Sequence, residues 1–196
     1  AGKTHAPKSP ARERVMSCPE CHQKLWQEAQ KDNTAASKPR LGLVAANIEA
    51  YRASFHARVK KGETQPLAFC EDCHSSHSFN IPQKDSPERA AWKLGTADVC
   101  GEKCHTDQLD EFKESVHGKA IYDKKDPKAA TCIDCHTSHA VGNTSAVPIK
   151  LAITANCGNC HTDPYKSYKA TYHGQISTLG YGNTAKCFDC HGTHGI

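Results

Sequence analysis

The sequence predicts a mostly irregular fold with short α-helices and little or no sheet. Leu, Ile, Val and Phe number 28 of the 196 residues, about 14%, which is below the roughly 20% that usually allows a chain to bury enough apolar surface. No segment alternates apolar and polar residues as a strand does. Pro, Gly and Asn interrupt the chain, as at Ile81-Pro82, Asp126-Pro127 and Gly182-Asn183. We therefore expect a bound group to supply most of the core.

The expected elements follow in chain order. Helices are expected at about 18–30, 105–117 and 161–173, each running from a Cys/His motif described below. The segment between His22 and Tyr51 is about 22 residues longer than its later counterparts and is expected to form a helix followed by a loop. The longest apolar stretches, 41–48 and 147–155, are too short to span a membrane, which takes about 20 residues.

All twelve cysteines lie in six motifs that each end in histidine. Five have the form Cys-x-x-Cys-His and one is a residue longer; they span 18–22, 70–74, 100–105, 132–136, 157–161 and 187–191. Disulfide or zinc sites are the alternatives, but a disulfide framework has no rule that places His after every second Cys. Cys-x-x-Cys-His is typical of c-type haem attachment, in which the thiols bond to the haem and the histidine binds iron. For the longer motif, a local Cys100–Cys104 disulfide remains the alternative.

The cysteines expected to attach six c-type haems are Cys18, Cys21, Cys70, Cys73, Cys100, Cys104, Cys132, Cys135, Cys157, Cys160, Cys187 and Cys190.

A threefold repeat organises these motifs. The segments 51–56, 112–117 and 168–173 each contain an aromatic residue, a cation, a Ser or Thr and a final His. A motif of the form Cys-x-Asp-Cys-His-x-x-His follows each segment, after 14 or 15 residues. The sequence therefore predicts one domain, 1–196, built of three modules with two motifs each, at about 14–77, 96–139 and 153–194.

The histidines are sufficient to ligate six irons from both sides. Six follow a cysteine: His22, His74, His105, His136, His161 and His191. Six more occupy repeat positions: His56, His77, His117, His139, His173 and His194. His5 lies outside the repeat and is expected on the surface, and the single methionine, Met16, is poorly placed to reach an iron. Two histidines per iron leave no open position for a substrate, which favours electron transfer over catalysis.

Spacing also constrains the partners of these histidines. A motif histidine and the histidine three residues later would lie on nearly the same side of a helix. They cannot bind opposite sides of one iron, so the second is expected to serve a neighbouring haem. His117 and His173 are expected to ligate irons within their own modules.

Charge and chain features restrict partners and location. The net charge of +4 does not favour nucleic acid as a partner, because the propionates of six haems would outweigh it. Covalent haem attachment takes place outside the cytoplasmic membrane of prokaryotes, so the expected location is the periplasm or the cell surface. The first residues, Ala-Gly-Lys, show no signal peptide, which fits a processed form.

The motifs and repeats over 14–196 resemble bacterial and archaeal multihaem c-type cytochromes. They are similar to the periplasmic pentahaem donors of nitrite reduction, to decahaem conduits, and to extracellular cytochromes that form conducting filaments. The resemblance implies an elongated fold organised around a chain of haems. The longer motif at 100–105 and the insertion in the first module depart from the family pattern.

Three functions remain open. The chain is a carrier that relays electrons between redox proteins, or a subunit of a filament of identical chains, or a reductase of nitrite, hydroxylamine or a sulfur oxyanion.

Overall fold

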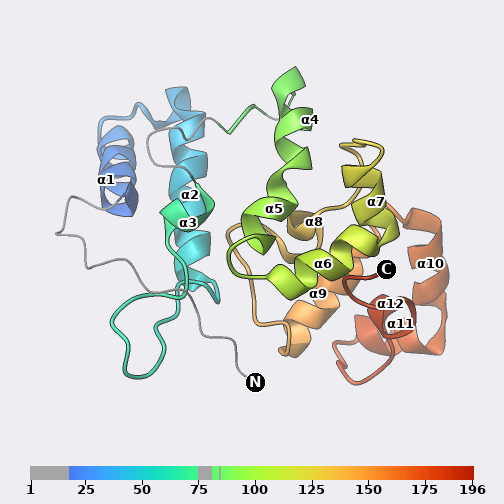
Figure 1. Cartoon of the computed structure of the whole chain (residues 1–196). Coiled ribbons are helices and arrows are strands. Elements are labelled where there is room, and N and C mark those ends of the chain that lie inside the picture. Colours follow the sequence, from blue (N-terminus) through green and yellow to red (C-terminus); the bar gives the residue numbers. More distant parts are fainter. Residues whose placement is uncertain (1–17, 75–80, 84) are drawn as a thin grey trace. The chain divides into compact units, whose positions relative to one another are not determined.

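The computed structural model describes residues 18–74, 81–83 and 85–196, and it is helical over about 60% of them (Figure 1). The elements are α1 Cys18–Lys31, a 3₁₀ turn η1 Ala35–Ser37, α2 Pro39–Ala53, α3 Cys70–Cys73, α4 Pro87–Leu94, α5 Thr96–Gly101, α6 Thr106–Glu114, α7 Val116–Tyr122, α8 Cys132–His136, α9 Val147–Cys157, α10 Thr162–Ala170, α11 Tyr172–Thr178 and α12 Cys187–His191. The prediction of short helices without a sheet is confirmed. In these ranges the only β-type pairing is an isolated bridge between Val59 and Pro66.

The chain divides into two compact units, Ala1–Glu49 and Ala50–Ile196. The division falls inside α2, within the first predicted module. The three-module organisation stays a prediction from the repeats.

The described part of the first unit is a helical hairpin. Helix α1 ends at Lys31 and is followed by Asn33, whose φ of 55° is left-handed. The backbone N–H of Thr34 donates to the carbonyl of Ala29 at 2.8 Å, as in a Schellman motif. Gly42 of α2 packs on the indole of Trp26, where a Cβ would lie 2.9 Å from the ring. The segment expected to be a helix and a loop is therefore two helices, because α2 continues to the aromatic repeat segment.

In the second unit, the two other predicted helices are present but each is divided in two. Ser115 separates α6 from α7, and its hydroxyl accepts from the backbone N–H of Gly118 at 2.9 Å. Thr171 separates α10 from α11 in the same way, accepting from Gly174 at 3.2 Å. In the second and third copies of the repeat, the Ser or Thr is thus a helix N-cap, and it places the following histidine near the start of a new helix. In the first copy, α2 ends at Ala53 and no helix begins at Ser54.

The apolar core is small, as the composition predicts. The buried hydrophobic residues among those described are Ala29, Ala45, Ala97, Leu109, Phe112 and Ile121. The last four form one cluster that joins α5, α6 and α7. Side-chain packing among the described residues therefore buries little apolar surface.

Within the described ranges, no helix combines the length and the apolar character that crossing a membrane requires.

Candidate cofactor and metal centres

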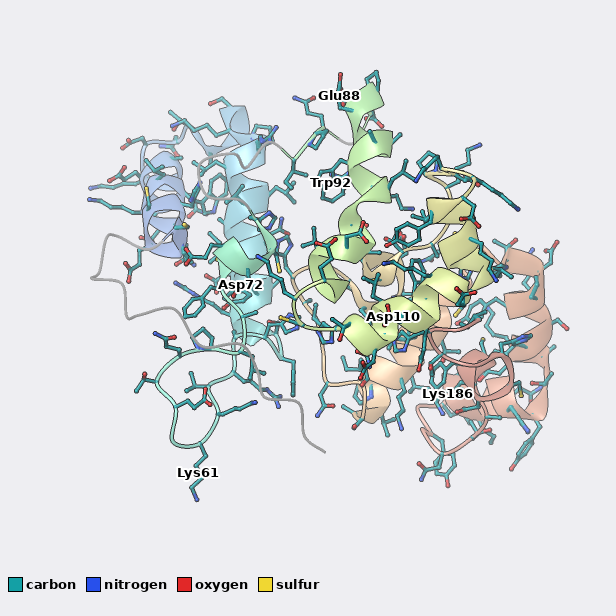
Figure 2. The ribbon with its side chains drawn as sticks, viewed as in Figure 1. Lys61, Asp72, Glu88, Trp92, Asp110 and Lys186 are labelled. Atoms are coloured by element: carbon teal, nitrogen blue, oxygen red, sulfur yellow. The ribbon has the colours of Figure 1, made fainter. Side chains whose placement is uncertain are left out.

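The Cys/His motifs occur in two kinds of local structure. The second, fourth and sixth motifs begin the short helices α3, α8 and α12, with the first cysteine at the first helical position. The aspartate of each motif occupies the third position, where its Oδ2 accepts from the backbone N–H of the residue before the cysteine. These bonds are Phe69 to Asp72 at 2.7 Å, Thr131 to Asp134 at 2.8 Å and Lys186 to Asp189 at 2.8 Å. The repeated aspartate therefore fixes the helix start. Figure 2 labels Asp72 and Lys186 at two of these starts.

The third and fifth motifs lie at the end of a helix instead. Cys100 is in the last turn of α5, and Cys157 ends α9. The next histidine in each motif folds back, since the backbone N–H of His105 donates to Cys100 at 3.2 Å and that of His161 donates to Cys157 at 2.9 Å. The extra residue of the longer motif is thus accommodated in the turn, and the histidine returns to the same backbone position.

The first motif begins α1. The Nδ1 atom of His22 lies 2.9 Å from the carbonyl oxygen of Cys18. In the tautomer that donates this bond, Nε2 keeps its lone pair for a metal.

The aromatic residue of the repeat ties each histidine segment to the motif that follows it. The hydroxyl of Tyr51 donates to the carbonyl of Ala68 at 2.5 Å, and that of Tyr168 donates to the carbonyl of Ala185 at 3.0 Å. Both acceptors stand two residues before a motif cysteine. The middle copy has Phe112, which packs in the core instead.

Four pairs of histidine rings lie at nearly the same separation. The ring centres are 6.2 Å apart for His56 and His105, 6.0 Å for His74 and His139, 6.0 Å for His117 and His161, and 6.2 Å for His136 and His194. Each pair joins a histidine that follows a cysteine to a histidine from a repeat position. All eight residues belong to the second unit.

This separation fits two imidazoles on opposite sides of one metal ion. With each nitrogen about 2 Å from the metal and roughly 1 Å from its ring centre, the ring centres would stand about 6 Å apart. Aromatic pairs that only pack together spread over about 4.5–7 Å. The ring planes of the four pairs meet at 14–47°, which axial ligation allows because each ring turns freely about its bond to the metal.

His117 was expected to ligate an iron within its own module. Its ring lies beside His161 of the third module and not beside a motif histidine of its own module. No second histidine ring is recorded next to His22, His173 or His191 among the residues described. His77, a predicted ligand, lies outside the described residues, as do His5 and Met16.

The two histidines of a Cys-x-Asp-Cys-His-x-x-His motif were expected to have different partners. The ring contacts agree with this expectation, although the local structure differs from the expected helix. Helix α8 ends at His136, and Thr137 has a left-handed φ of 64°, so the chain turns rather than continuing as a helix. His136 then lies beside His194, while His139 lies beside His74. The two histidines of one motif therefore face different partners.

Burial keeps several of these imidazoles in the form that binds metals. It lowers the pKa of five histidines below the usual value of 6.5, and a neighbouring histidine lowers the pKa further in four of them. The five are His56, His74, His117, His136 and His139. Near neutral pH they carry a free lone pair, as metal ligation requires.

Thiols of successive motifs lie close together. The thiol of Cys100 hydrogen-bonds to Cys132, which raises the pKa of Cys100 and lowers that of Cys132. Burial, with a smaller contribution from nearby Cys187, raises the pKa of Cys157 to about 11. The first cysteines of the third and fourth motifs, and those of the fifth and sixth, are therefore neighbours in space.

The donor set suits an iron that already has ligands of its own. The described residues hold no group of three or more His, Cys, Asp or Glu side chains able to bind a metal ion. Structural zinc takes four protein ligands, whereas a porphyrin supplies four nitrogens and needs only two axial ligands from the protein. Paired histidines beside paired cysteines fit the second case.

Comparisons with protein-family models, with curated proteins and with solved structures each returned no match.

One residue near the motifs gave no signal in the sequence. Lys186, just before Cys187, is only 4% exposed. Its Nζ donates to the carbonyls of Gly182 and Thr184 at 2.6 Å each and lies 3.9 Å from Asp189. A lysine between a loop and a motif looks like a surface residue in sequence; here it holds the loop against the start of α12.

Proposed function

We propose that this chain is an electron-transfer protein that carries six covalently attached c-type haems, each with two histidine ligands. It relays electrons between redox protein partners outside the cytoplasm, in the periplasm or at the cell surface. The twelve motif cysteines would hold the haems, and the six motif histidines would each supply one axial ligand.

The observation that carries the proposal is the set of four histidine pairs at 6.0–6.2 Å. Each pair would fill both axial positions of an iron, and an iron without an open position exchanges electrons rather than binding a substrate. The haem supplies the redox chemistry, and the protein supplies its position, ligands and surroundings. The thiol contact between Cys100 and Cys132 supports close spacing of successive haems.

Mass spectrometry of the intact protein, produced in a host that matures c-type cytochromes, tests this proposal. The expected mass is that of the polypeptide plus six haems, and the expected visible and EPR spectra are those of low-spin, six-coordinate iron. A smaller number of haems, or a spectrum dominated by five-coordinate iron, would contradict the proposal. Ready binding of carbon monoxide by one reduced haem would favour the reductase alternative.

A second candidate function, a subunit of a polymeric extracellular filament, is favoured by the surroundings of His173. This histidine is exposed, and its neighbour Tyr172 is 74% exposed. Among the described residues no histidine ring is recorded beside it, whereas its counterparts His56 and His117 each have one. A histidine from another chain would complete the site. Negative-stain imaging and size-exclusion chromatography distinguish the two functions, because regular fibres would exclude a monomeric carrier.

A further inference from the structure

All four histidine pairs follow one rule: each joins consecutive modules. His56 and His74 of the first module lie beside His105 and His139 of the second. The second module, through His117 and His136, meets the third at His161 and His194. Among the described residues, no recorded histidine pair lies inside one module.

We propose that each of these four irons is attached to one module and receives its second ligand from the neighbouring module. The inference rests on the proposed function and goes beyond it by assigning each ligand to an attachment site. At the first junction, His74 and His139 bind the iron attached at Cys70 and Cys73, and His105 and His56 bind the iron attached at Cys100 and Cys104. At the second junction, His136 and His194 bind the iron attached at Cys132 and Cys135, and His161 and His117 bind the iron attached at Cys157 and Cys160.

The exchange is reciprocal at each junction. At the first junction, the second module gives His139 to an iron attached to the first module, and the first module gives His56 to an iron attached to the second. At the second junction, His194 and His117 have the same two roles. Two metal centres would therefore hold each pair of modules together, where the apolar core contributes little.

Backbone contacts place the chain for this exchange. The N–H of Phe55, next to His56, donates to the carbonyl of Val141 at 2.7 Å. The N–H of Val116, next to His117, donates to the carbonyl of Ile196, also at 2.7 Å. Each bond brings a repeat histidine of one module to the end of the next module.

A test of epistasis between attachment and ligand variants examines this assignment directly. In the six-haem protein, His139→Ala should convert one haem to five-coordinate, high-spin iron, measured by EPR and normalised to the haem content found by mass spectrometry. The double variant Cys70→Ala, Cys73→Ala removes the haem that His139 is inferred to serve. In that five-haem background, His139→Ala should add no high-spin signal.

His194→Ala is the matched control, because it removes the same repeat position one module later. In the Cys70→Ala, Cys73→Ala background it should still create one high-spin haem. The second junction allows an independent test if the first background does not fold. In a Cys132→Ala, Cys135→Ala background, His194→Ala should add no high-spin signal, whereas His139→Ala should still create one high-spin haem.

The opposite pattern would overturn the inference. If His139→Ala still produced a high-spin haem without Cys70 and Cys73, and became silent without Cys132 and Cys135, the ligand would belong to the haem of its own motif. If the protein without cysteine substitutions still carried six haems, that result would leave the proposed function intact. A chain that attached no haem would remove the proposed function itself.

Discussion

Asp72, Asp134 and Asp189 each place a carboxylate oxygen on a backbone N–H at the start of a helix of four or five residues. A helix this short does not form alone, because the first turn fixes several residues for a single hydrogen bond. The aspartate satisfies one of the unpaired N–H groups and so holds the two cysteines and the histidine in a defined turn.

The capping role predicts a difference between two substitutions at Asp134. Asp134→Ala should lower the free energy of unfolding of the holoprotein by about 1 kcal/mol, because the N–H of Thr131 loses its acceptor. Asp134→Asn keeps a carbonyl oxygen there and should lose less. Guanidinium unfolding, followed by helix content, measures both, and equal losses would show that charge rather than capping matters.

A second prediction concerns the hydroxyl of Tyr168, which contacts the carbonyl of Ala185 and, at 2.9 Å, the hydroxyl of Ser177. Tyr168→Phe should cost about 1 kcal/mol of unfolding free energy, since a partly buried carbonyl loses its donor. Tyr172→Phe is the control, because Tyr172 is 74% exposed, and it should be neutral. Thermal unfolding checks both variants; a neutral Tyr168→Phe would show that the aromatic ring alone matters.

At this scale, the sequence identifies residue types but not partners. The motif and repeat histidines could be identified in the sequence because the three copies share the same residue pattern. The partner of His117 was not, because a ligand set depends on how modules pack and the spacing within a module says nothing about that. The role of Lys186 was hidden for the same reason.

Among whole elements, the sharp turns between α6 and α7 and between α10 and α11 depend on glycine. A Cβ at Gly174 would lie 2.1 Å from the carbonyl oxygen of Tyr168, and one at Gly118 would lie 1.8 Å from that of Phe112. Both atoms belong to backbone that cannot move without disturbing the helix before it. The position that follows each of these histidines therefore has no room for a side chain larger than that of glycine.

Gly174→Ala should accordingly destabilise the protein by about 1–3 kcal/mol, the usual cost of overpacking. Gly195→Ala is the control, because nothing lies within 4 Å of its Cβ position, and its effect should stay within about 0.5 kcal/mol. Differential scanning calorimetry of the holoproteins would show a lower Tm for the first variant only. Equal Tm values would mean that the turn relaxes without cost.

Three of the helical regions were predicted in place, and only the first of them was also predicted in extent. Helix α1 was expected at 18–30 and is observed at 18–31. Its start coincides with the Cys/His motif, and Asn33 terminates it. The predicted helices at 105–117 and 161–173 are each divided, since Ser115 and Thr171 cap new helices. The sequence shows these hydroxyl residues, but a Ser or Thr inside a helical stretch also fits an exposed position, and only the backbone geometry separates the two.

For the molecule as a whole, the small buried core predicts that the polypeptide does not fold without the proposed haems. Protein made in cells that lack haem attachment should show far less helix by far-UV circular dichroism than the 60% described here, and no cooperative thermal transition, because entropy outweighs the apolar burial. The holoprotein is the control. A cooperative, fully helical apoprotein would show that packing is sufficient.

Pairing from each repeat to the following one also bears on how such a molecule can gain length. A duplicate of the middle repeat, inserted before the third, would pair its histidines with those of the repeat before it and of the repeat after it. The existing histidine pairs would therefore need no change of sequence. If the proposed function holds, gene duplication would then add redox centres in steps of two. The number of repeats, rather than any change of side chains, would set the distance over which charge travels.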